Sequence, residues 1–71
     1  MDDTKLIRMA NQIATNLAAK GEAVAVAETA EHIGKFWDPR MKAAIFADDL
    51  SRLTPIARAA IEKLKAQMTA A

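Results

Sequence analysis

The sequence predicts an all-α fold, a small bundle of about four short helices in a single domain of residues 1–71. Three observations predict this class. Large apolar residues recur at spacings of three and four, which gathers them on one face of a helix. No segment alternates apolar and polar residues with the period of two that indicates a half-buried strand. Two pairs, Asp38-Pro39 and Thr54-Pro55, combine a capping side chain with the residue favoured at the first helical position.

A first helix is expected over residues 3–19. Met9 lies beside its apolar stripe, which repeats at i, i+4, i+7 and i+11 and consists of Leu6, Ala10, Ile13 and Leu17. Asp2, Asp3 or Thr4 can cap the start of this helix. Gly21 follows its end, where a residue in the left-handed conformation is wanted.

A second helix is expected over residues 22–36. Its stripe has the same spacing and consists of Val26, Ala30, Ile33 and Trp37, with Ala23 and Ala27 beside it. Gly34 costs ~1 kcal/mol relative to alanine inside a helix. A glycine at this position indicates either close packing or the beginning of helix termination.

Two further helices complete the predicted bundle. The third covers residues 39–50 after the Asp38-Pro39 start, and its inward residues are Met41, Ala44, Ile45 and Phe46. Residues 51–54 form a connection, and the fourth helix covers residues 55–67. One face of that helix carries Ala57, Ile61, Leu64 and Met68, and its flank carries Ile56 and Ala60.

Composition disfavours several classes of function. The net charge is only +1, and without a basic block or stripe a nucleic-acid site is a poor interpretation. Either candidate recognition helix of a helix-turn-helix motif would carry acidic residues beside its basic ones. Cysteine is absent, which removes disulfides and thiolate chemistry. The acidic start resembles no signal peptide, and the longest apolar run covers only residues 23–27, so we expect a cytoplasmic protein.

No constellation of residues indicates catalysis, a metal site or a bound cofactor. His32 is the only histidine, and with Glu28 one turn before it supplies two ligands of an incomplete site. Asp48-Asp49 lacks the further oxygen ligands that calcium or magnesium requires. The order Asp49-Leu50-Ser51 is also not the Asp-Ser-Leu of a phosphopantetheine attachment site. We therefore expect no catalytic, metal or cofactor residues in this chain.

The most distinctive segment is residues 32–41, which holds the histidine, two of three aromatic residues and one proline. Adjacent residues on a helix point about 100° apart, so Trp37 can continue the core stripe while Phe36 faces a partner. Arg40 at a helix start is disfavoured by the helix dipole. Pairing with Asp38, Glu31 or a carboxylate of a partner would explain it. The alternative for the two aromatic residues is that both lie in the core, and the alternative for Arg40 is an arginine exposed to solvent.

Two stretches resemble a known family. They are Lys5-Leu6-Ile7-Arg8-Met9-Ala10-Asn11-Gln12-Ile13-Ala14 and Ala30-Glu31-His32-Ile33-Gly34-Lys35-Phe36-Trp37-Asp38-Pro39-Arg40-Met41. Together with Leu53-Thr54-Pro55 they resemble the delta subunit of NAD-dependent, molybdenum-containing formate dehydrogenases, over about residues 5–64. Family members often carry a glycine-rich link where this chain has residues 48–52.

The resemblance implies a non-catalytic accessory subunit that binds and stabilises the alpha subunit and supports molybdenum cofactor insertion or retention. It implies that the complex, with its beta and gamma subunits, carries bis-molybdopterin guanine dinucleotide, iron–sulfur clusters and FMN. A self-associating helical module unrelated to formate oxidation is the alternative. The residues expected to bind a partner are Met9, Asn11, Gln12, His32, Phe36, Trp37, Arg40 and Met41.

Overall fold

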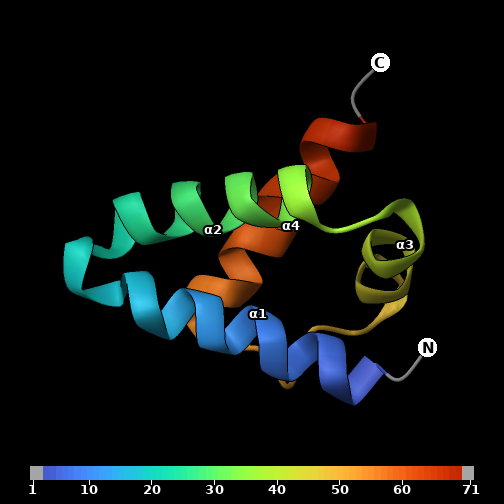
Figure 1. The fold of residues 1–71 in the computed structure, drawn as a ribbon, viewed down its shortest axis with the longest axis horizontal. Helices are drawn as coiled ribbons and strands as arrows, with labels where there is room; N and C mark the ends of the chain where they lie inside the picture. The colour runs from blue at the N-terminus through green and yellow to red at the C-terminus, as the bar shows by residue number, and fades with distance from the viewer. Residues whose placement is uncertain (1–2, 70–71) are drawn as a thin grey trace.

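The computed structural model describes residues 3–69, including the side chains of residues 3–67, and its architecture is all-α as predicted (Figure 1). The elements in chain order are α1 (Asp3–Leu17), the 3₁₀ turn η1 (Ala18–Lys20), α2 (Glu22–Phe36), α3 (Pro39–Ala47) and α4 (Pro55–Thr69). Helices α1 and α2 form an antiparallel hairpin. Helix α4 crosses behind this hairpin, and α3 lies at its open end. In the described part of the chain, no helix has both the length and the hydropathy needed to cross a bilayer.

The hairpin turn departs from the expected end of the first helix. The α-helical geometry ends at Leu17 rather than Ala19, and one 3₁₀ turn follows. Gly21 has the positive φ that was expected, 101°, but its ψ of 149° is extended rather than left-handed helical. Its carbonyl accepts from the Ala25 N–H at 2.8 Å, so α2 begins at once. The proposed cap Asp2 lies outside the described residues.

Helix α2 has the predicted bounds, but its buried face is broader than predicted. The buried residues are Ala25, Thr29, Ala30 and Ile33, and Val26 is half-buried. Ala23 and Ala27, which were expected beside the stripe, are exposed, so that prediction was wrong. The reason is that α2 packs against α1 and α4 together, which brings the row Ala25–Thr29–Ile33 inward.

Gly34 marks the close approach of α2 and α4. A Cβ atom at this position would lie 3.2 Å from Cδ1 of Leu64, tighter than ordinary van der Waals contact. The helix continues for two more residues to Phe36. Close packing is therefore the reason for the glycine, rather than helix termination.

Helix α3 begins as predicted. Asp38 is its N-cap, with a side-chain oxygen that accepts from the Met41 N–H at 2.9 Å, and Pro39 is the first helical residue. The inward residues are also confirmed: Ile45 is fully buried, and Met41, Ala44 and Phe46 pack against the core.

The end of α3 was predicted wrongly. The helix stops at Ala47 because the next two carboxylates fold back on the chain: Asp48 Oδ1 accepts from the Leu50 N–H and Asp49 Oδ1 from the Ser51 N–H, each at 2.9 Å. These local bonds compete with helix continuation. Leu50 then adopts a φ of 66°, and its side chain is buried.

Helix α4 begins at the predicted Thr54-Pro55 start and extends two residues beyond the predicted end. The Ala57 N–H donates to Thr54 Oγ1 at 3.4 Å. Its buried residues are Ala57, Ala60, Ile61 and Leu64, with Ile56 packed at the edge. Met68, expected on the same face, has a side chain outside those described. Leu50 and Leu53 complete the core and were not predicted.

Candidate partner-binding surface

The two adjacent aromatic residues face opposite environments. Trp37 is 4% exposed and belongs to the core, whereas Phe36 is 72% exposed. The chain leaves the helix at Trp37, where φ is −84° and ψ is 137°, and its N–H still donates to the Ile33 carbonyl. The predicted division, one aromatic in the core and the other turned outward, is therefore what the fold shows.

Phe36 is held at the surface by His32, one turn earlier on α2. The two ring centroids are 4.8 Å apart, and the ring planes are inclined at 44°. Beside them Lys35 donates to Glu31 at 2.9 Å, and this bond with the lysine charge lowers the pKa of the Glu31 carboxyl. These four residues, with Leu17 and Glu28, line a shallow depression. Its rim therefore presents a large apolar ring among balanced charges.

A second, more apolar groove adjoins the first between α1 and α2. It has a volume of about 400 Å³ and is lined by Arg8, Met9, Gln12, Ile13, His32 and Trp37. Met9 and Ile13 are half-buried and pack against the core. His32 lines both hollows, so the groove and the exposed Phe36 form one continuous surface. We call this set, the six groove residues with Phe36, the aromatic face.

The aromatic face unites five of the eight residues expected to bind a partner, Met9, Gln12, His32, Phe36 and Trp37. Of these, Trp37 contributes mainly to the core. Gln12 is exposed, and its Nε2 donates to Oδ1 of Asn16 at 3.2 Å, a bond between two surface amides that a partner can replace.

Asn11 points to a different part of the molecule. Its Nδ2 donates to the Arg52 carbonyl at 3.1 Å, and its Oδ1 accepts from the Thr54 N–H at 2.9 Å. The amide therefore binds the backbone of its own chain rather than that of a partner. Asn11 thus holds the connection between α3 and α4 against α1, and we assign it a structural role.

Arg40 and Met41 also divide between surface and core. Met41 is half-buried and packs against the core. Arg40 is exposed, and in the described part of the chain it has no hydrogen-bond or ion-pair partner. The two expected intrachain partners are engaged elsewhere, since Asp38 caps α3 and Glu31 pairs with Lys35. Of the alternatives for Arg40, pairing with Asp38 or Glu31 is therefore not what the fold shows, and pairing with a carboxylate of a partner stays a prediction.

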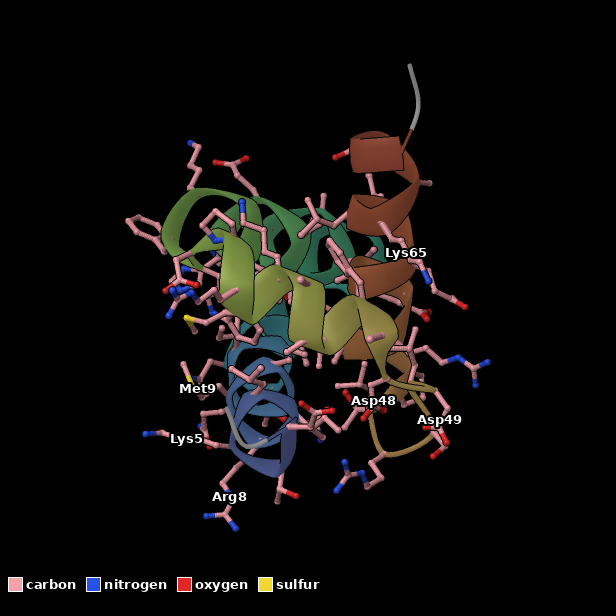
Figure 2. All side chains as sticks on the ribbon, turned by 90° about the vertical axis from the view of Figure 1, so that its right-hand side faces the viewer. Lys5, Arg8, Met9, Asp48, Asp49 and Lys65 are labelled. Carbon is pink, nitrogen blue, oxygen red and sulfur yellow. The ribbon has the colours of Figure 1, made fainter. Side chains whose placement is uncertain are left out.

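Charge is distributed unevenly around the molecule. Figure 2 shows Lys5 and Met9 projecting to the left of α1 and Arg8 projecting below it, while Asp48 and Asp49 lie to the right, near the end of α3. Like Arg40, Lys5 and Arg8 have no intrachain partner among the described residues. The acidic pair, in contrast, is engaged: Arg52 Nη2 lies 3.4 Å from Asp48 Oδ2, and Ser51 donates twice to Asp49.

Residues 3–69 contain no group of three histidine, cysteine, aspartate or glutamate side chains arranged to hold a metal ion. Glu28 and His32 do line one depression, but Glu28 Oε1 lies 3.2 Å from the Lys20 ammonium. The potential metal ligands of this pair are thus the Glu28 carboxylate, which already pairs with Lys20, and the His32 imidazole.

The family to which the chain belongs is decided by comparison with known sequences. Residues 5–61 match the profile of the NADH-dependent formate dehydrogenase delta subunit FdsD. The chain belongs to this family. The match includes α1, α2, α3 and the first half of α4, and so contains the whole aromatic face. No curated protein and no solved structure gives a significant match. This chain is therefore a delta subunit of an NAD-dependent formate dehydrogenase.

Proposed function

We propose that this delta subunit is a non-catalytic accessory subunit that binds the catalytic alpha subunit in the cytoplasm. By holding that subunit it supports insertion or retention of the molybdenum cofactor. The beta and gamma subunits complete the complex. This chain binds no cofactor itself, and the bis-molybdopterin guanine dinucleotide, iron–sulfur clusters and FMN are held by the other subunits.

The observation that carries this proposal is the exposure of Phe36, 72%, beside a groove that is almost entirely apolar. An apolar ring held outward next to an apolar groove marks a contact site on a small domain. Aromatic and arginine side chains are enriched among the residues that dominate binding energy. The family match supports the proposal that this contact is made within a formate dehydrogenase complex.

The size of the chain supports the same role. A domain of this length buries only about 60% of the surface that its unfolded chain exposes, so its own core leaves little reserve of stability. Alanine contributes 17 of the residues counted as hydrophobic, so the core contains few large apolar side chains. A partner that binds only the folded form stabilises it by mass action. Burial of the aromatic face against the alpha subunit supplies that stabilisation.

The test is to produce the complex with and without this chain and to measure molybdenum per alpha subunit by mass spectrometry of the metal. Without the delta subunit we expect less molybdenum and lower formate oxidation, and both return when the chain is supplied again. In parallel, a tagged delta subunit should retain the alpha subunit on an affinity column. Equal molybdenum content in both preparations contradicts the cofactor role, and absence of the alpha subunit from the column contradicts the binding role.

A further inference from the structure

We propose that the aromatic face receives an acidic segment of its partner, in which a large apolar side chain is flanked by aspartate or glutamate. This inference rests on the function proposed above and specifies the chemistry of the contact. The apolar side chain enters the groove between α1 and α2, and the carboxylates meet Lys5, Arg8 and Arg40.

The size and lining of the groove indicate which apolar side chain of the partner it can accept. Its apolar lining residues are Met9, Ile13 and Trp37, and its volume is about 400 Å³. A hollow of this size accepts a leucine, methionine or aromatic side chain. The Met9 side chain in this lining is unbranched and adapts to the shape of the group that enters. Phe36 stands beside the groove and can cover the inserted group against water.

The charges around the groove indicate that the polar side chains of the partner segment are acidic. Arg8 lines the groove itself, and Lys5 projects from the same side of α1 as Met9 (Figure 2). Arg40 is exposed three residues after Trp37. All three cations lack an intrachain partner among the described residues. Of the carboxylates nearest in sequence, Glu31 pairs with Lys35, while Asp38 caps α3 and keeps its negative charge. Three unpaired cations against this one carboxylate leave a net positive charge around the groove.

Charge complementarity therefore selects an acidic partner over a second copy of this chain. A symmetric dimer through the aromatic face would bring two copies of the same positively charged patch together. Such like-charge contacts disfavour an interface. The acidic residues of the other side, Asp48 and Asp49, are already engaged within their own loop.

Carbodiimide cross-linking of the purified complex tests the chemistry directly. The reagent joins a lysine ammonium to a carboxylate as an amide, with loss of water and no spacer, so it reports only groups in contact. We expect mass spectrometry to find Lys5 joined to an aspartate or glutamate of the alpha subunit. Arg8→Lys and Arg40→Lys should give additional cross-links to the same segment. Lys63, exposed on α4 without a described partner, is the internal control and should give none.

Charge reversal provides the energetic test. Arg8→Glu should weaken retention of the alpha subunit about tenfold or more and reduce the salt dependence of binding, because a rim charge acts through the field it presents. Lys63→Glu changes the net charge equally on another helix and should leave retention unchanged. Both residues are exposed, so far-UV circular dichroism should show that both variants are folded.

The outcomes separate this inference from the proposed function. Retention of the alpha subunit by Arg8→Glu at wild-type strength, with cross-links only from other faces, overturns the acidic contact but leaves alpha-subunit binding in place. A cross-link from Lys5 to a second delta subunit overturns it in favour of self-association. Failure of the wild-type chain to retain the alpha subunit refutes the proposed function and this inference together.

Discussion

Replacement of Asn11 by alanine should loosen the connection that leads into α4. The side chain makes two hydrogen bonds across 41 and 43 residues of sequence, one to the Arg52 carbonyl and one from the Thr54 N–H. It thereby fixes the backbone immediately before the first residue of α4. Alanine at this position removes both bonds and leaves a half-buried Thr54 N–H without its acceptor.

The cost can be worked out from these two bonds. Loss of a typical hydrogen bond costs about 0.5–1.5 kcal/mol, and a buried donor left without a partner costs about 1–3 kcal/mol. Because the bond to Arg52 is exposed and that to Thr54 is half-buried, we expect a total of about 2–3 kcal/mol. At about 4–8 °C for each kcal/mol in a domain of this size, the melting temperature should fall by about 10–20 °C.

Urea and thermal unfolding of the purified chain, followed by circular dichroism, measure this cost. Gln12→Ala is the matched control, since the neighbouring amide bonds only to exposed Asn16 and its loss should change stability by less than about 0.5 kcal/mol. Asn11→Asp should give an intermediate loss, because it retains the acceptor for Thr54 but not the donor to Arg52. If Asn11→Ala is no more destabilising than the control, the assignment of this residue to the fold is wrong.

Three further changes should have separable effects. Trp37→Ala, in the core, should lower the free energy of unfolding by about 3–5 kcal/mol in urea titration; a loss below 1 kcal/mol would contradict its burial. Gly21→Ala forces a side chain into a φ of 101° and should cost about 1–3 kcal/mol in the same titration, although no atom lies near its Cβ; an unchanged midpoint would refute the strain. Ser51 donates twice to the Asp49 carboxylate and lowers its pKa below the ordinary 3.8. The stabilisation from Asp49 is therefore fully present above that pH and is lost as the pH falls through the lower folded value. Asp49→Asn should flatten this part of the pH–stability profile; the same slope in both proteins would contradict the assignment.

The helices that could be predicted are those with large apolar residues at regular spacing and a capping pair. Both proline starts and the bounds of α2 follow from spacing and cap chemistry. The outward direction of Phe36 beside a buried Trp37 was one of two alternatives that the spacing left open. The buried face of α2 does not, because it depends on where α4 crosses. Ala25 and Thr29 carry little hydrophobic signal, and only the crossing helix makes them interior.

The connection after α3 shows a second limit of prediction. Consecutive aspartates can extend a helix end or fold back on the backbone, and a sequence pattern does not distinguish these outcomes. Leu50 and Leu53 are the two large apolar residues of this connection, and their burial could have been predicted from that hydrophobicity. The bonds of Asn11 to this connection could not, because they join residues that only the tertiary fold brings together.

For the aromatic face, the sequence indicated individual residues that could bind a partner, and only the fold shows which of them lie on one surface. Met9 and Gln12 come from α1, and His32 and Phe36 come from α2. The antiparallel hairpin brings the two pairs onto one surface. The continuity of the apolar groove with Phe36 is a property of that packing.

The most direct test of the account is the affinity of the delta subunit for the alpha subunit with and without the Phe36 ring. Since this ring is 72% exposed, Phe36→Ala should leave the free energy of unfolding nearly unchanged and weaken binding about tenfold or more. Val24→Ala, which trims the other exposed large apolar residue in the described chain, should bind as tightly as wild type. A stably folded Phe36→Ala variant that binds the alpha subunit with wild-type affinity would contradict the claim that the aromatic face holds the complex together.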